Sequence, residues 1–104
     1  METIAFRMQL RPDEEEAYRA RHDAIWPELT QILRDAGVAD YWIFLDDETH
    51  HLFAVLKRSA NHTMDRLADE DGMKRWWAYM ADLMATHPGG RSLEYPLKPM
   101  FHMA

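Results

Sequence analysis

The sequence predicts an α+β protein of the split βαβ, or ferredoxin-like, class, in which helices cover one side of a four-stranded antiparallel sheet. Two observations carry this prediction. Short segments with strand-like apolar patterns are separated by longer segments that carry an apolar residue every third or fourth position. Their order along the chain is βαββαβ. The length of 104 residues fits a single domain over residues 1–104.

The first strand is expected over residues 3–10, where apolar and polar side chains alternate. A single long helix is expected next, over residues 14–36, with Asp13 as its N-cap and Gly37 directly after its end. Pro27 lies inside this helix. Because proline removes a backbone hydrogen bond and crowds a carbonyl of the preceding turn, we expect a kink there.

A hairpin is expected next, with strands over residues 40–46 and 51–56. Tyr41 shares one strand face with the alternate apolar residues that follow it, whereas Trp42 and Phe44 share the other face. Both faces are therefore apolar and need cover. A chain of this length supplies helices for one face only, so we expect a second subunit on the other.

The third part of the chain is expected to be helical over residues 61–85, in two pieces separated by the Asp-Gly at 71–72. In the second piece the apolar residues follow one line, with Trp77 close to that line and Trp76 at its edge. The last strand is expected over residues 93–103. Because it contains two prolines, we expect an edge strand, or one that leaves the subunit.

Composition narrows the function classes. Asp and Glu number 18 against 12 Lys and Arg, a formal net charge of −6, which argues against nucleic acid and anionic membranes as partners. The sequence has no cysteine, which excludes a disulfide, a thiol nucleophile and a cysteine zinc site. The N-terminus shows no signal peptide, and no apolar run approaches the ~20 residues that span a bilayer, so we expect a cytoplasmic protein.

His22 is the most informative candidate residue, because it lies inside the apolar stripe of the first predicted helix. One interpretation is a core histidine that binds a backbone carbonyl. The other is a pocket wall, since Tyr18 lies one turn earlier, Arg21 borders the stripe, and the Pro27 kink follows closely. An imidazole with an ordinary pKa of about 6.5 can both give and take a proton near neutrality.

Trp76, Trp77 and Tyr41 are further candidates, and core packing is the ordinary interpretation of each. Adjacent helical residues point about 100° apart, however, so both indoles cannot face the centre of the core. At least one is therefore expected at the edge of a pocket. Flat indole faces suit the C–H faces of sugars, and a buried Tyr41 hydroxyl needs a partner that a polar ligand could supply.

A metal site is not expected. The other histidines lack the i, i+4 helical pairing and the HExxH spacing of metal ligands. The sequence also lacks a glycine-rich phosphate loop and a GxSxG nucleophile elbow.

Two segments have the residues and the spacing of known family signatures. Residues 18–29 read YRARHDAIWPEL and fit the pattern YxxRHxxIWPEL, and residues 73–80 read MKRWWAYM, with a Trp pair followed by a Met. The FRMQL start, the DYWIFLD strand and the late FHM also fit. On these residues the chain resembles the L-rhamnose mutarotase family over nearly its whole length. The main departure is the segment 87–98, at the predicted pocket rim and last strand.

The resemblance implies a homodimer with the dimeric α+β barrel form of the ferredoxin-like fold. It implies an isomerase that interconverts the α and β anomers of L-rhamnose without a cofactor. By position, His22 corresponds to the family's proton donor, and Tyr18, Tyr41, Trp76 and Trp77 correspond to its substrate-binding residues. The opposing base is left open, and water or another side chain could serve.

Two alternatives stay open at this point. A mutarotase of another deoxysugar would use the same acid and the same kind of pocket. A dimeric α+β barrel monooxygenase or ligand-binding protein would instead take up haem or an aromatic substrate, or bind a sugar without accelerating its anomer exchange.

Overall fold

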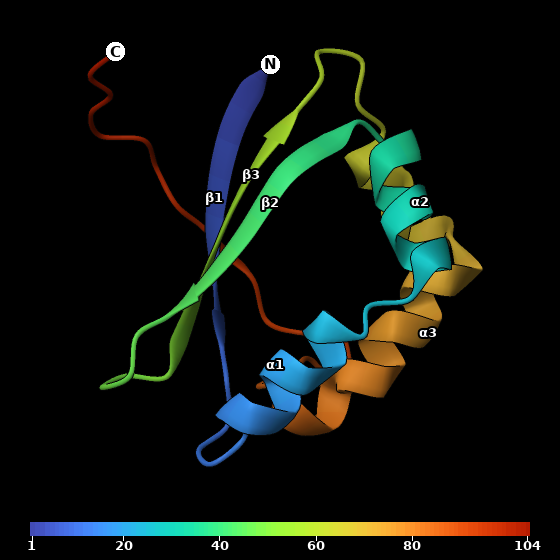
Figure 1. Ribbon diagram of the computed structural model, residues 1–104, viewed down its shortest axis with the longest axis vertical. Coiled ribbons are helices and arrows are strands. Elements are labelled where there is room, and N and C mark those ends of the chain that lie inside the picture. The colour runs from blue at the N-terminus through green and yellow to red at the C-terminus, as the bar shows by residue number, and fades with distance from the viewer.

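A four-stranded antiparallel sheet forms one wall of the molecule, and the helices all lie against one face of it (Figure 1). The computed structural model describes residues 1–104. The strands are β1 (Glu2–Gln9), β2 (Val38–Leu45), β3 (His51–Arg58) and β4 (Tyr95–Pro96). Their order across the sheet is β2-β3-β1-β4, which is the ferredoxin-like order and confirms the predicted α+β class.

The helical segments alternate with the strands as predicted, but the first one is divided. They are α1 (Glu15–Asp23), α2 (Pro27–Asp35), the 3₁₀ helix η1 (Met64–Asp69), α3 (Asp71–Met80) and the 3₁₀ helix η2 (Ala81–Leu83). The prediction of a single kinked helix over residues 14–36 is wrong. Trp26 has extended backbone angles, φ −65° and ψ 130°, because the residue before a proline is disfavoured in the α region. Pro27 then begins α2, a position that proline favours.

The predicted helix ends are partly correct. Gly37 follows α2 with φ 93°, as expected for a residue that ends a helix. Asp13 is not the N-cap of α1, because it adopts φ 67° and Glu14 takes the cap position without a side-chain hydrogen bond. In the predicted region 61–85 the two pieces are present, but they separate at the extended residue Glu70, and the first piece is a 3₁₀ helix.

The last strand is much shorter than the predicted range 93–103. Only Tyr95–Pro96 pairs, with β1, at the edge of the sheet. The prolines explain the early end, since Pro96 and Pro99 have no backbone N–H to donate to a ladder. Beyond β4 the chain runs away from the sheet on the side opposite the helices, where Phe101 is 86% exposed (Figure 1).

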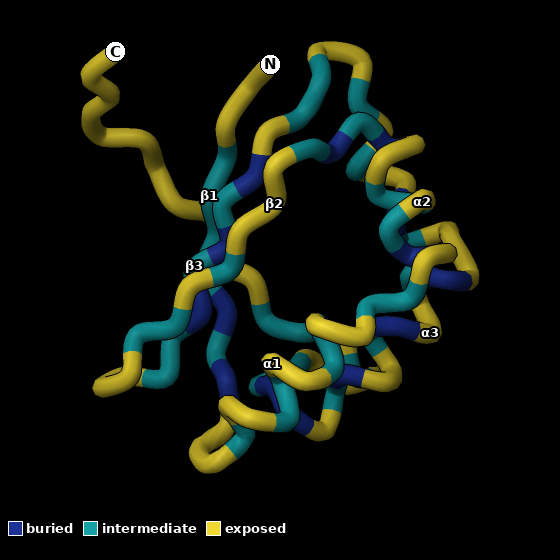
Figure 2. Tube along the Cα trace, viewed as in Figure 1, coloured by how far each residue is buried: buried dark blue, intermediate teal, exposed yellow.

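The core lies between the sheet and the helices, where the buried segments concentrate (Figure 2). Met8 of β1 faces Leu52 of β3 in the register, and both are buried. Ala54 and Leu56, further along β3, are completely buried. Alternation along the strands therefore directs one set of side chains inward, as the sequence pattern predicts. None of the helices is long and apolar enough to cross a membrane.

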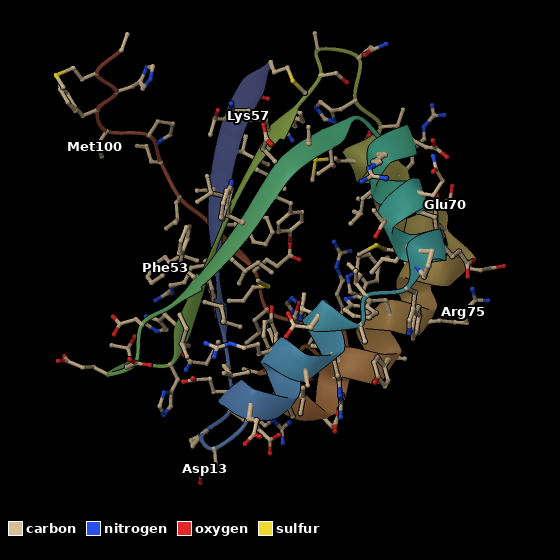
Figure 3. The ribbon with its side chains drawn as sticks, viewed as in Figure 1. Asp13, Phe53, Lys57, Glu70, Arg75 and Met100 are labelled. Atoms are coloured by element: carbon tan, nitrogen blue, oxygen red, sulfur yellow. The ribbon has the colours of Figure 1, made fainter.

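The outer face of the sheet is also apolar and has no cover within the chain. Trp42 is 60% exposed and Phe44 56%, and their rings stack with centroids 6.1 Å apart. Phe53 of β3 points the same way, away from the helices (Figure 3). The predicted division of β2 into an inner Tyr41 face and an outer face with Trp42 is thus confirmed.

Candidate functional site

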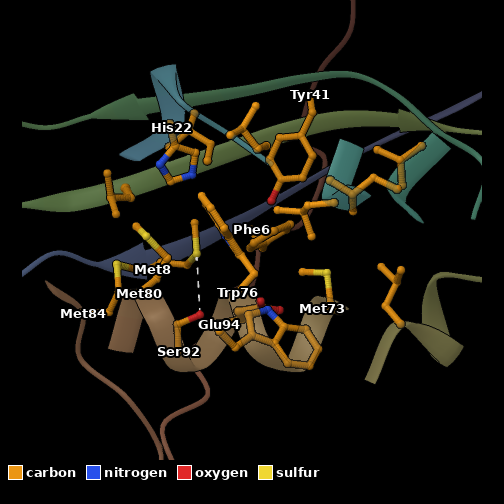
Figure 4. Close-up of a pocket in the computed structure, with 18 of the residues that line it drawn as sticks. Phe6, Met8, His22, Tyr41, Met73, Trp76, Met80, Met84, Ser92 and Glu94 are labelled. Atoms are coloured by element: carbon orange, nitrogen blue, oxygen red, sulfur yellow. Dashed lines mark hydrogen bonds between the residues drawn. The ribbon is translucent and has the colours of Figure 1, made fainter. Parts of the chain in front are cut away.

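A cavity of about 850 Å³ lies between the inner face of the sheet and the helices. Most of its wall residues are apolar or aromatic, and the others include charged and polar side chains, a combination that suits the binding of a small polar molecule. The structure brings all five predicted site residues to this cavity: His22, Tyr18, Tyr41, Trp76 and Trp77. Figure 4 shows His22, Tyr41 and Trp76 around it, on separate elements.

His22 reaches the cavity from the last turn of α1. Its Nδ1 lies 3.0 Å from the backbone carbonyl oxygen of Tyr18. Because a carbonyl can only accept, Nδ1 carries a hydrogen and donates it, so Nε2 is the ring nitrogen left for a ligand. Burial lowers the pKa of His22 below its ordinary value of 6.5, against the opposing effects of the Tyr18 carbonyl and the Asp23 carboxylate.

Aromatic rings fix the plane of this imidazole. The Tyr18 ring stacks on the His22 ring with centroids 4.3 Å apart, and Trp76 meets His22 edge-on at 5.4 Å. Trp26 supports Trp76 from outside the cavity, with ring centroids 5.1 Å apart, and itself stacks on Tyr79 at 5.4 Å. The catalytic candidate is therefore held by a packed aromatic cluster, which limits its rotamers.

Tyr18 lines the cavity from α1 and Tyr41 lines it from β2. Burial raises the pKa of both Tyr18 and Tyr41 well above the ordinary value of 10, and the nearby Tyr18 and Glu94 raise that of Tyr41 further. Both hydroxyls therefore stay protonated at neutral pH and can donate or accept a hydrogen bond. A β-bulge at Asp40, with φ 46°, precedes Tyr41, whose hydroxyl points into the cavity (Figure 4).

The two tryptophans of α3 occupy different environments, as two adjacent helical positions must. Trp76 is only 6% exposed and belongs to the core, while Trp77 is half-buried at the cavity edge. The guanidinium of Arg91 lies 4.5 Å from the centre of the Trp77 ring. The structure confirms that one of the two indoles lies at the cavity edge. The apolar stripe, however, predicted Trp77 near the core and Trp76 at the edge. The structure has the opposite arrangement, because Trp76 packs against Trp26.

Arg21 ties α1 to the end of α3 from outside the cavity. Its guanidinium binds both carboxylate oxygens of Asp82, at 2.9 and 3.2 Å, and donates to the backbone carbonyl of Tyr79 at 2.7 Å. This pairing lowers the pKa of Asp82 and raises the pKa of Arg21. The contact holds the helix that carries His22 against the helix that carries Trp76.

The sequence interpretation missed the charged residues that line the cavity, and two of these, Arg91 and Glu94, lie beside the proposed site residues Trp77 and Tyr41. These two come from the segment after η2, which has neither helical nor strand periodicity and in which the family resemblance is weakest. No sequence signal identified them, because a loop residue reaches a cavity only through the path of its backbone. That path is fixed here by hydrogen bonds from His87 N to Arg91 O, 2.8 Å, and from Leu93 N to Ala85 O, 3.0 Å.

The fold and the cavity together define a class of protein: a ferredoxin-like α+β domain with an aromatic pocket, in which the His22 imidazole lies near two tyrosines. Such a pocket suits acid–base chemistry on a small, partly apolar ligand that carries hydroxyl groups.

Comparisons with known proteins identify the family. The model of the L-rhamnose mutarotase family matches residues 3–103. The chain is 68% identical over 103 residues to a protein named L-rhamnose mutarotase from Burkholderia cenocepacia, covering 99% of both. It is 54% identical over 104 residues to one from Sinorhizobium fredii, covering 100% of both. It also matches the crystal structure of L-rhamnose mutarotase from Formosa agariphila, with a TM-score of 0.92, 42% identity and 100% coverage of each chain. The chain belongs to the L-rhamnose mutarotase family, whose members are isomerases that act on sugar anomers.

Proposed function

We propose that this chain exchanges the α and β anomers of L-rhamnopyranose, with His22 as the acid that protonates the ring oxygen. The observation that carries this assignment is the setting of the His22 ring. Its Nδ1 is committed to a backbone carbonyl at 3.0 Å, and the ring lines the cavity. In the imidazolium form of His22, in which both ring nitrogens carry a hydrogen, Nε2 is then the atom that delivers the proton.

The reaction asks little more of the protein than proton transfer and orientation. On ring opening the ring oxygen gains a proton, the bond between C1 and that oxygen breaks, and the C1 hydroxyl loses its proton to leave an aldehyde. Rotation about C1–C2 and closure on the other carbonyl face give the second anomer. A positioned acid or base contributes about 10²–10⁴-fold, and the reaction already proceeds slowly in water, so this scale suffices.

The other site residues would bind the sugar. The half-buried indole of Trp77 would contact its C–H groups, the buried indole of Trp76 would form the wall behind it, and the hydroxyls of Tyr18 and Tyr41 can pair with its hydroxyls. A 6-deoxysugar carries a methyl group where the parent hexose has a hydroxyl. The apolar side chains that line the cavity, Met8 and Met73 among them, suit that methyl group and would leave an added hydroxyl without a partner.

A homodimer that forms through the outer face of the sheet is part of the proposal. The stacked pair Trp42 and Phe44 and the exposed residues Tyr95 and Leu97 make that face apolar across several strands. An exposed apolar patch of this kind is typical of an interface. The cytoplasmic location stays a prediction.

Saturation-transfer NMR on equilibrated sugars tests the activity and the substrate together. We expect the wild-type protein to accelerate anomer exchange of L-rhamnose, and to accelerate that of L-mannose less, because L-mannose differs only by a hydroxyl on C6. Folded protein that leaves L-rhamnose exchange at the rate of buffer alone contradicts the proposal. Faster exchange of another deoxysugar, such as L-fucose, would assign the activity to that sugar instead.

A further inference from the structure

We propose that Glu94 is the second proton-transfer group of this site, and that its carboxylate takes the proton of the anomeric hydroxyl while His22 protonates the ring oxygen. This inference rests on the proposed function. It names the base that the sequence left open, and it places that base in the segment where the chain departs most from the family pattern.

The position of Glu94 is the first argument. His22 comes from α1 and Glu94 from the segment between η2 and β4, yet both line the same cavity. In Figure 4 His22 lies in the upper part of the pocket view and Glu94 in the lower part. Because the ring oxygen and the anomeric hydroxyl are bonded to the same carbon, one sugar between these walls can present the two oxygens to two different groups.

The backbone that carries Glu94 is fixed on both sides. On one side Leu93 N donates to Ala85 O at 3.0 Å, and Arg91 lies over Trp77 at 4.5 Å. On the other side Tyr95 pairs with β1 as part of β4. Because the backbone on both sides of Glu94 is anchored, only the side-chain rotamers of Glu94 remain to be fixed when substrate binds.

The electrostatic setting is the second argument. The carboxylate makes no ion pair within 4.0 Å, so it is not committed to a structural partner. Glu94 is exposed at the open side of the cavity, and the partial burial of its carboxyl group there raises its pKa above the ordinary value of 4.5, while the positive groups Arg91 and His87 oppose this. Its charge also acts on the Tyr41 hydroxyl, which brings it close to a proposed sugar ligand.

The two pKa shifts suit the two roles. A carboxylate with a raised pKa is a stronger base, and an imidazolium with a lowered pKa is a stronger acid. The groups that act on His22 are the Tyr18 carbonyl and Asp23, so neither shift is caused by a direct pairing between His22 and Glu94.

The proton balance closes within the pair. In ring opening His22 Nε2 gives its proton to the ring oxygen, the bond from C1 to that oxygen breaks, and Glu94 receives the proton of the C1 hydroxyl. In ring closure the protonated Glu94 returns a proton to the new anomeric oxygen, and His22 recovers its proton from the C5 hydroxyl. Both groups end each turnover as they began it.

The substitution Glu94→Gln tests the proposal, since it keeps the shape and hydrogen bonding of the side chain but removes its basicity. We expect kcat for L-rhamnose exchange to fall about 10²-fold while KM changes by no more than a few-fold. The matched control is Glu48→Gln, in the exposed turn between β2 and β3, which should retain the wild-type rate. Near-UV circular dichroism of the tryptophans checks that each variant is folded.

Two further readouts separate a base from a structural residue. In Glu94→Ala, added formate should restore part of the lost kcat. The wild-type pH profile of kcat/KM should be bell-shaped, because one group must be protonated and the other not, and Glu94→Gln should lose one of its two limbs. A wild-type kcat in Glu94→Gln, a change confined to KM, or a slow variant with no formate rescue and both limbs intact would each overturn the role of Glu94. Failure of the wild-type protein itself to exchange L-rhamnose would instead contradict the proposed function.

Discussion

At the scale of single residues, His22 combines two uses that the sequence presented as alternatives. It binds a backbone carbonyl, as a core histidine does, and it also lines the cavity. The helical stripe predicted that its ring would face inward. The sequence could not predict which nitrogen the carbonyl would occupy, because that depends on the rotamer selected by packing against Tyr18 and Trp76.

The lowered pKa of His22 makes the stability of the protein depend on pH. Its pKa in the folded state lies below the unfolded value of 6.5, so the unfolded chain binds more protons between those two values. The stabilisation from neutral His22 is complete above pH 6.5 and is lost as pH falls through the folded pKa. We expect the free energy of unfolding in urea to decrease over that interval, and His22→Asn to flatten the decrease.

Glu94 acts with the opposite sign, because its raised pKa gives stabilisation at low pH that is lost as pH rises through the folded value. Because the two effects oppose each other, the free energy of unfolding of His22→Asn is compared with that of the wild-type protein at each pH. A wild-type slope that persists unchanged in His22→Asn would show that this histidine does not titrate differently in the folded state.

The tyrosine hydroxyls give a prediction on binding. Removal of one neutral hydrogen bond to the sugar costs about 0.5–1.5 kcal/mol, so Tyr41→Phe should raise KM by roughly 2- to 10-fold and leave kcat within a few-fold. Tyr79→Phe is the matched control, because that ring stacks on Trp26 outside the cavity. Concentration-dependent exchange rates provide both constants, and an unchanged KM in Tyr41→Phe would remove this residue from the binding set.

At the scale of elements, the sequence predicted the order of strands and helices and the inward faces, because both follow from local periodicity. The prediction was wrong where the same local sequence is compatible with two structures. A proline such as Pro27 can kink a helix or begin one, and here the extended backbone at Trp26 means that Pro27 begins α2. The last strand ended after two residues because pairing depends on the edge that β1 offers and on available N–H groups.

The candidate site shows the same limit. Residues from α1, β2 and α3 meet because the element order puts both helices on one face of the sheet, so five of the cavity residues could be chosen from the sequence. Glu94 could not be chosen in this way. Its position depends on the closed loop between Ala85 and Leu93, which has no periodic pattern.

The turn from α2 to β2 allows a prediction on stability. Gly37 has φ 93°, and a Cβ there would lie 2.4 Å from Ser59 Oγ and 3.1 Å from the His62 backbone. A residue other than glycine in the left-handed region usually costs about 1–2 kcal/mol. Gly37→Ala should therefore lower the free energy of unfolding by more than this amount. Gly89→Ala, at φ 104° with no atom within 4 Å, isolates the backbone cost. Equal urea midpoints for the two variants would contradict the close approach.

At the scale of the whole molecule, the sheet is covered on one side only. Helices and the cavity occupy the inner face, while aromatic side chains stand on the outer face and the tail after β4 runs out on that side (Figure 1). A monomer would leave Trp42 and Phe44 in water. Burial of such side chains contributes about 1.5–3 kcal/mol each, which favours association.

Sedimentation tests this proposed association. We expect the wild-type protein at micromolar concentration to sediment with twice the chain mass of 12.3 kDa. The double substitution Trp42→Glu with Phe44→Glu should weaken association at least about tenfold, since two apolar anchors become charged. Tyr79→Gln, a change of an exposed aromatic on the helix side, should leave the mass unchanged. A compact wild-type species of 12.3 kDa would reject the dimer.

The proton donor is the central claim, and anomer exchange of L-rhamnose in the presence of His22→Asn tests it most directly. Saturation-transfer NMR should show an enzyme-dependent rate about 10²–10⁴-fold below that of wild type, with the variant folded. His50→Asn removes an imidazole from the hairpin turn outside the cavity and should keep the wild-type rate. If folded His22→Asn exchanges L-rhamnose as fast as the wild-type protein, His22 is not the acid.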